Sequence, residues 1–201
     1  QSMKPSTVPG LFEVVVDGRV VYYSQSAHSI ILGQILSKDG KNITREREME
    51  LLAAKLKDLP LDKAIKIGEG KNTVIEFTDP DCSFCRKGFE FFKARTDITK
   101  YVFFVPLPSH PDAVPKIRYV LCAQDKKAAY EEAMSGKLDE MKFKPCTDPK
   151  AEELFKLHEQ VAAQMHISAT PMFFINGTPV RGADIEAIKR LLGENSEKAQ
   201  H

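Results

Sequence analysis

The stretch TVIEFTDPDCSFC, residues 73–85, decides the fold of this chain. Its first part, residues 73–78, is β-branched and mostly apolar, which is typical of a strand buried in the middle of a sheet. Two cysteines, Cys82 and Cys85, follow after a short break, and residues 83–95 then carry apolar side chains at helical spacing. The sequence therefore predicts a C-x-x-C motif at the point where a central strand passes into a helix.

This position favours a reactive cysteine. The thiolate is the nucleophile in disulfide chemistry, and a cysteine in water is mostly a thiol near neutral pH. A helix N-terminus supplies partial positive charge and unpaired backbone N–H groups, so we expect Cys82 to be the attacking sulfur. Cys85 lies one turn further along the helix, and we expect it to be the protected sulfur that resolves a mixed disulfide.

Charged residues around the motif act in opposite directions on this thiolate. Arg86 and Lys87 favour it, whereas Asp79 and Asp81 oppose it. We expect the helix dipole and the basic residues to prevail by a modest margin.

Two neighbours of the cysteines allow two interpretations each. Glu76 either lies buried beneath the pair, where it could accept the proton that Cys85 loses, or faces solvent from its strand; the alternation of side chains along a buried strand does not decide this. Phe84 is expected to be exposed beside the reactive sulfur, where it would contact apolar substrate. The alternative is that Phe84 packs within the helix.

The C-x-x-C motif is also compatible with half of a metal site. Zinc ribbons carry a second C-x-x-C after ~15–20 residues, whereas the other cysteines of this chain, Cys122 and Cys146, are solitary. His110, His158 and His166 have no ligand spacing with a cysteine. We therefore expect neither a metal nor any other cofactor.

The N-terminal region predicts a small β meander. Residues 11–16 and 19–23 flank an Asp-Gly pair, which is a strong hairpin signal, and residues 29–32 form a third run after an extended lead-in over residues 1–9. A meander of about 40 residues buries little surface alone and leaves an open sheet edge. We expect a homodimer through residues 10–40; the alternative is that the meander packs against its own chain.

Three regions follow from these patterns. Thr44 is expected to cap a helix with one apolar stripe, and Pro60 is expected to end it. We divide the chain into a dimerisation domain over residues 1–43, a linker helix over residues 44–60 and a catalytic domain over residues 61–201.

The catalytic region has the order strand, C-x-x-C helix, strand, helical stretch, hairpin and helix. This order is typical of a mixed sheet covered by helices on both faces, in an α+β fold with an inserted helical subdomain. Besides the central strand and its helix, elements are expected at residues 64–67, 101–105, 115–124, 126–135, 149–165, 173–180 and 185–192.

Composition narrows the function classes. The chain has 201 residues, 42% of them hydrophobic and 28% charged, which is ordinary for a globular protein. A formal net charge of +1 indicates no surface for nucleic acid or anionic lipid. No apolar run approaches the ~18 residues that cross a bilayer, so we expect no membrane insertion. No signal peptide is visible, and we expect any such segment to have been removed.

The chain resembles the thioredoxin fold and, within it, the DsbC/DsbG family of periplasmic disulfide isomerases. The resemblance covers about residues 8–193. It is carried by the N-terminal meander, the linker helix, and four segments of the catalytic region: Phe77–Asp79 before the C-x-x-C, Cys122–Lys126, Ala169–Pro171 and Asn176–Thr178.

The resemblance implies several roles beyond the nucleophile and resolving thiol. Pro171 would follow a cis peptide bond, with Thr170 presenting its backbone to the substrate, whereas the residues alone are equally compatible with a trans turn. Cys122 and Cys146 would form a structural disulfide rather than remain as buried thiols. Glu76 departs from the isomerases and is similar to the buried acid of the related monomeric oxidase DsbA.

The implied function is that of a periplasmic, homodimeric thiol-disulfide isomerase or reductase. It would reshuffle incorrect disulfides in misfolded secreted proteins, and a DsbD-like membrane thiol reductant would keep its dithiol reduced. Alternatives are a DsbG-like reductase of sulfenic acids, a chaperone-like binder of unfolded proteins, and a monomeric oxidase.

Overall fold

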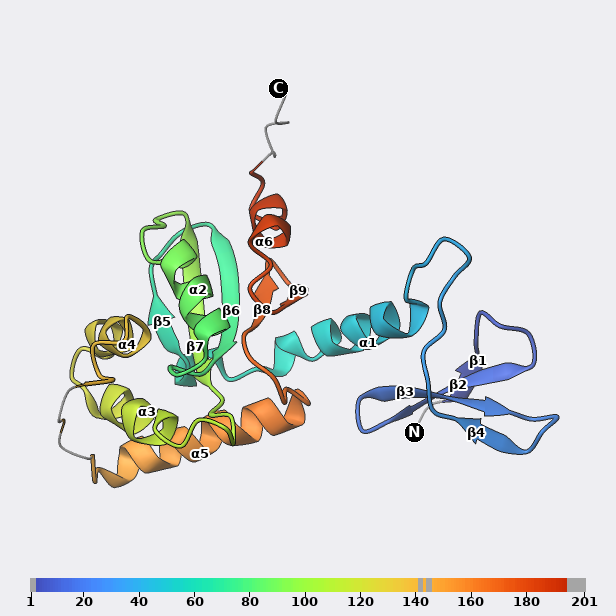
Figure 1. Ribbon diagram of the computed structural model, residues 1–201, viewed down its shortest axis with the longest axis horizontal. Coiled ribbons are helices and arrows are strands. Elements are labelled where there is room, and N and C mark those ends of the chain that lie inside the picture. Colours follow the sequence, from blue (N-terminus) through green and yellow to red (C-terminus); the bar gives the residue numbers. More distant parts are fainter. Residues whose placement is uncertain (1–2, 141–142, 144–145, 195–201) are drawn as a thin grey trace. The chain divides into compact units, whose positions relative to one another are not determined.

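The computed structural model describes residues 3–140, 143 and 146–194 (Figure 1). The chain divides into two compact units, Gln1–Lys57 and Asp58–His201. Among the described residues, no helix is both long and apolar enough to cross a lipid bilayer.

The first unit contains a four-stranded antiparallel sheet in the order β1-β2-β3-β4. Its strands are β1 (Met3–Pro5), β2 (Leu11–Val16), β3 (Arg19–Ser24) and β4 (Ser29–Ile31). The turn between β2 and β3 has positive φ at both Asp17 (49°) and Gly18 (74°), as a two-residue hairpin requires. The meander is therefore confirmed, and part of the expected lead-in adds a fourth strand: β1 pairs with β2, and its proline sits at the sheet edge, where it is tolerated.

The helix of the first unit begins earlier than expected. α1 (Ile43–Ala54) is capped by Asn42, whose side chain accepts a hydrogen bond from the Arg45 backbone N–H. The expected cap at Thr44 is wrong, because the Thr44 hydroxyl is buried and bonds to the Tyr22 hydroxyl at 2.6 Å. The expected end at Pro60 is also wrong, because α1 ends at Ala54 and two short 3₁₀ turns follow it, η1 (Leu56–Asp58) and η2 (Leu61–Lys63).

The second unit is built on a five-stranded mixed sheet in the order β5-β7-β6-β8-β9. Its strands are β5 (Ile65–Ile67), β6 (Asn72–Thr78), β7 (Ile98–Phe104), β8 (Met172–Ile175) and β9 (Thr178–Arg181). β6 and β7 are parallel, and the other pairings are antiparallel. As predicted, the strand before the C-x-x-C lies in the middle.

Helices pack on both faces of this sheet. They are α2 (Ser83–Phe92), α3 (Ala113–Cys122), α4 (Lys126–Met134), α5 (Pro149–Gln164) and α6 (Ile185–Leu191). Successive strand residues point to opposite faces. Val102 packs with Cys85 and with α3 and α4, whereas Phe103 lies edge-on against His158 of α5. The predicted α+β class with a mixed, helix-covered sheet is confirmed.

Candidate active site

Cys82 and Cys85 lie at the N-terminus of α2. Cys82 is the N-cap residue with extended backbone angles, φ −78° and ψ 119°, and its carbonyl accepts from the Arg86 N–H at 3.1 Å. Its side chain makes no capping hydrogen bond. As the N-cap residue, Cys82 nevertheless lies beside the unpaired backbone N–H groups of the first turn, as the sequence predicts.

A loop distant in sequence lies against the cysteines. The Thr170–Pro171 peptide bond is cis, as the resemblance implies, and the Thr170 carbonyl lies 3.6 Å from the Cys82 Sγ. Cys82 is 6% exposed and Cys85 is fully buried, and neither is in a disulfide. The structure thus brings together four of the expected site residues.

The two thiols differ strongly in acidity. The pKa of Cys82 is lowered to about 5, chiefly by a hydrogen bond from the Cys85 thiol and also by the backbone N–H groups of Cys85 and Phe84, against the opposing effect of burial. The pKa of Cys85 is raised, first by burial and then by its bond to Cys82. Near neutral pH the pair is therefore one thiolate and one thiol.

Arg86 differs from its expected role beside the thiolate. Its guanidinium bonds to Asp139 at 2.6 Å and 2.8 Å, to the Pro80 carbonyl at 2.7 Å and to Asp81 at 3.2 Å. Lys116 also bonds to both carboxylates. Arg86 and Asp81 are paired with each other, so their opposite effects on the Cys82 thiolate largely cancel.

Asp79 has more contacts than the sequence suggests. Its carboxylate is fully buried and accepts hydrogen bonds from the backbone N–H groups of Asp81 and Leu107, each at 2.7 Å, and from His110 Nδ1 at 2.9 Å. Sequence reasoning missed this cluster. One feature of the sequence could have indicated it: Asp79 follows β6 and His110 follows β7. These neighbouring strands are parallel, so their carboxyl ends meet at one edge of the sheet.

Glu76 is buried, so its solvent-facing interpretation is wrong. Its Oε2 accepts from Lys100 Nζ at 2.9 Å and from the Tyr130 hydroxyl at 3.1 Å, and Lys100 Nζ also bonds to the Tyr130 hydroxyl at 2.9 Å. The Glu76 Oε1 has no hydrogen-bond partner among the described residues. The carboxylate is therefore an ion-paired group inside the domain, with one oxygen still able to accept a hydrogen bond.

Phe84 points its side chain into solvent. It is 62% exposed, although it follows Cys82 directly in the first turn of α2. The alternative that it packs within the helix is wrong, and an apolar ring stands beside the reactive motif.

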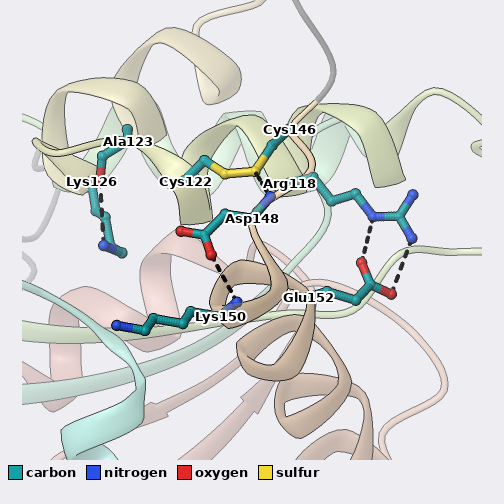
Figure 2. The surroundings of a disulfide bond; sticks show 8 residues. All are labelled: Arg118, Cys122, Ala123, Lys126, Cys146, Asp148, Lys150 and Glu152. Atoms are coloured by element: carbon teal, nitrogen blue, oxygen red, sulfur yellow. Dashed lines mark hydrogen bonds and ion pairs between the residues drawn. A yellow bond between two sulfur atoms is a disulfide. The ribbon is translucent and has the colours of Figure 1, made fainter.

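Cys122 and Cys146 form the disulfide that the resemblance implies (Figure 2). Their Cα atoms are 6.3 Å apart, and the bond closes a segment that contains α4. The Asp148 N–H donates to the Cys146 sulfur at 3.4 Å, next to the start of α5. The bond thus ties the C-terminal end of α3 to the entrance of α5.

Metal ligation receives no structural support in the part of the chain that is described. No group of three or more His, Cys, Asp or Glu side chains there is arranged to hold a metal ion. His110 instead bonds to Asp79, and His158 bonds to the backbone of Phe104 and Lys63.

Comparisons with known proteins agree with this fold. A model of the thioredoxin-like domain matches residues 59–191, and a model of the disulfide bond isomerase protein N-terminal domain matches residues 1–45. The solved disulfide interchange protein of Neisseria gonorrhoeae is 30% identical, with a TM-score of 0.56 over 70% of this chain and 100% of that chain.

The curated relatives that the chain matches are also thiol:disulfide interchange proteins. The probable thiol:disulfide interchange protein DsbC of Bordetella avium is 33% identical over 182 residues, which are 86% of this chain and 61% of the relative. DsbC of Escherichia coli is 27% identical over 187 residues, which are 90% of this chain and 75% of the relative. The chain therefore spans about three fifths of the length of the Bordetella relative.

The sheet order, the cysteine pair and the cis-proline loop define a thioredoxin-like dithiol protein. The chain belongs to the DsbC family of thiol:disulfide interchange proteins, with a DsbC-type N-terminal domain ahead of its thioredoxin-like domain.

Proposed function

We propose that this protein exchanges thiols and disulfides on misfolded, disulfide-containing proteins, with Cys82 as the nucleophile and Cys85 as the resolving thiol. The observation that carries the proposal is the opposite shift of the two pKa values, down to about 5 at Cys82 and upward at Cys85. Such a pair attacks readily and resolves slowly, which gives the bound substrate time to rearrange.

The reaction begins when the Cys82 thiolate attacks one sulfur of a substrate disulfide. A bond forms between Cys82 and that sulfur, the substrate S–S bond breaks, and the leaving substrate thiolate takes up a proton. In isomerisation, a substrate thiolate later attacks the mixed disulfide and restores the Cys82 thiolate with no net redox change. In reduction, Cys85 attacks Cys82 instead, which releases a substrate dithiol and leaves the Cys82–Cys85 disulfide.

Glu76 supports the second route as the proton acceptor of Cys85. Its burial favours this role, as does its Oε1, which lacks a hydrogen-bond partner within the described part of the chain, because a carboxylate oxygen inside the domain can take a proton that bulk water cannot reach. In Glu76→Gln, we expect a slower resolving step with a changed pH dependence and unchanged alkylation of Cys82. An unchanged pH dependence of the resolving step contradicts the role.

Substrate contacts are assigned to the rim of the site. The Thr170 carbonyl beside Cys82 can pair with an extended substrate backbone next to Pro171, as a strand added to an edge does. The exposed ring of Phe84 supplies apolar contact without sequence preference.

The DsbC-type N-terminal domain supports a homodimer. Ile30 and Leu32 on and after the edge strand β4 are 68% and 80% exposed, and unpaired strand edges with apolar side chains favour pairing with another chain. We retain the division into residues 1–43, 44–60 and 61–201 for this assembly. A periplasmic location and a DsbD-like membrane reductant complete the proposal, because the dithiol must be reduced while Cys122–Cys146 is oxidised.

A refolding assay tests the proposed function. A substrate protein with scrambled disulfides is incubated with the intact chain, with Cys82→Ala and with Cys85→Ala. We expect recovery of native substrate with the intact chain, loss of recovery with Cys82→Ala, and slower isomerisation without net reduction for Cys85→Ala, because that change also removes the thiol that lowers the Cys82 pKa. Recovery that survives Cys82→Ala refutes the catalytic assignment and favours the chaperone-like alternative.

A further inference from the structure

A buried carboxylate lies immediately before the reactive motif. Asp79 is fully buried, and its main chain contacts both cysteines. Its N–H donates to the Cys85 Sγ at 3.4 Å, and its carbonyl accepts from the Cys82 N–H at 3.1 Å. The orientation of the Asp79 backbone therefore helps to fix the positions of both sulfurs.

Within residues 3–140, 143 and 146–194, three donors hold the Asp79 carboxylate. Oδ1 accepts from the Asp81 N–H, and Oδ2 accepts from the Leu107 N–H and from His110 Nδ1. Because a carboxylate oxygen only accepts, the Nδ1 of His110 carries the hydrogen. A buried acceptor that loses its donor has no water to replace it, so each of these bonds contributes to holding Asp79 in place.

The arginine and the lysine near the site do not take over this task. Arg86 and Lys116 bond to Asp81 and Asp139. Two of the three donors to the Asp79 carboxylate are backbone N–H groups, and the third is the His110 side chain. The His110 side chain is 25% exposed. The residue lies in a turn between β7 and α3, where its backbone N–H donates to the Leu107 carbonyl at 2.9 Å.

We propose that His110 is a positioning residue for disulfide exchange, holding the Asp79 main chain against the Cys85 sulfur through the bond to Asp79 Oδ2. The inference rests on the proposed function. In the resolving step the Cys85 thiolate attacks the Cys82 Sγ. The Cys82–Cys85 bond forms, the bond from Cys82 to the substrate sulfur breaks, and the substrate thiolate leaves and takes up a proton.

The negative charge at the start of that step lies on the Cys85 sulfur, and the N–H of Asp79 is a donor aimed at it. A preorganised donor at a charged sulfur stabilises the reacting form without rearrangement. His110 takes no proton from either cysteine; it acts through Asp79.

The test compares His110→Ala, His110→Asn and the parent full chain. The amide nitrogen of asparagine can stand where Nδ1 stands, so His110→Asn keeps the donor and removes the ring. Each reduced protein is mixed with oxidised glutathione and quenched with acid at intervals. Mass measurement then separates the glutathione mixed disulfide at Cys82 from the internal Cys82–Cys85 disulfide.

We expect conversion of the mixed disulfide to be about tenfold slower in His110→Ala and within about twofold of the parent in His110→Asn. His110→Phe, which keeps a ring but no donor, is expected to be as slow as His110→Ala and serves if the alanine variant does not fold. Ser109→Ala, an exposed neighbour, is the matched control and is expected to match the parent.

Two results overturn the proposal. One is an unchanged conversion rate in the variants without a donor. The other is equal slowing in His110→Asn and His110→Ala, since that indicates lost packing rather than a lost hydrogen bond. Failure of the proposed function is visible separately, because the parent's Cys82 would then react with iodoacetamide no faster than a cysteine in water.

Discussion

At the scale of single residues, Cys82 owes its acidity to its partner cysteine more than to nearby basic side chains. The hydrogen bond from the Cys85 thiol is the largest cause of the lowered Cys82 pKa, and helix N-terminal N–H groups add to it. Arg86, the obvious candidate in the sequence, is bonded to Asp139 and Asp81. The acidity of the site therefore depends on one sulfur donating to the other.

This dependence predicts the effect of changing Cys85. Cys85→Ala removes the donor, so the pKa of Cys82 should rise from about 5 toward its ordinary value of 9.0. Cys85→Ser keeps a donor and should raise the pKa less. The measurement is the rate of iodoacetamide alkylation of Cys82 against pH. Identical titration curves for the alanine variant and the parent would show that the partner thiol does not set the acidity.

His158 predicts a pH dependence of stability. It is fully buried, its Nδ1 accepts from the Phe104 N–H, and its ring also bonds to the Lys63 carbonyl. Burial lowers the pKa of His158 from 6.5, so the unfolded chain binds a proton at a higher pH than the folded one. The contribution of neutral His158 to the free energy of unfolding is therefore complete above pH 6.5. It is lost as the pH falls below that value toward the pKa of His158 in the folded protein.

Urea unfolding between pH 7.5 and 5.5 checks this prediction. The parent should lose stability on acidification, and His158→Gln, which cannot be protonated, should show a shallower dependence even though it is less stable overall. His166→Asn is the control, because His166 is exposed and its positive φ of 51° suits asparagine. A parent whose stability does not fall in this range would contradict the assignment.

At the scale of elements, a buried ion pair and the tyrosine bonded to it connect two strands and a helix of the second unit. Lys100 on β7 bonds to Glu76 on β6 and to Tyr130 on α4, and neither charged side chain is exposed by more than 3%. Removing one partner leaves the other charge buried and uncompensated.

Lys100→Met is therefore expected to destabilise the domain by about 3 kcal/mol. The double change Glu76→Gln with Lys100→Met should be distinctly more stable than Lys100→Met alone, because no charge then remains. Chemical denaturation of the four proteins in the cycle measures the coupling. Additive effects of the two changes would mean that the pair is not energetically linked.

Elements set by local chemistry were predictable from the sequence. The Asp-Gly hairpin between β2 and β3, the buried β6 and the helix after Cys82 all follow from turn residues and hydrophobic periodicity. The cap of α1 was not predictable, because Asn42 and Thr44 are both good caps. Only the packing of the Thr44 hydroxyl against Tyr22 decides between them.

The site was predictable only in part, for a similar reason. A recognisable motif marks Cys82 and Cys85, and the resemblance supplied Pro171 and the Cys122–Cys146 pairing. The bond between Asp79 and His110 joins segments 31 residues apart, and the pairing of Glu76 with Lys100 depends on strand register. Neither contact follows a fixed spacing in the sequence, so neither can be predicted from the sequence alone.

At the scale of the whole molecule, the proposed homodimer makes a direct prediction. Ile30→Lys places a charge on the exposed edge strand β4, where lysine opposes edge-to-edge pairing. Sedimentation equilibrium should show a dimer for the parent and a monomer for the variant. Alkylation of Cys82 should be unchanged, because the reactive pair lies in the other unit.

The exposed Lys38 offers the control for this experiment. Lys38→Ser removes an exposed charge of the same unit outside β4 and should leave the sedimenting mass unchanged. A parent that sediments as a single chain would remove the basis for the dimer, and the monomeric oxidase alternative would gain support.

The Cys122–Cys146 bond has a consequence for how the molecule comes into being. The segment that it closes carries both Tyr130, which bonds to Glu76, and Asp139, which bonds to Arg86. Under the proposed function, Cys122 and Cys146 must be oxidised to a disulfide while Cys82 and Cys85 of the same chain end as reduced thiols. A newly made copy with the proposed activity therefore needs an oxidant for the first pair of sulfurs and a reductant for the second.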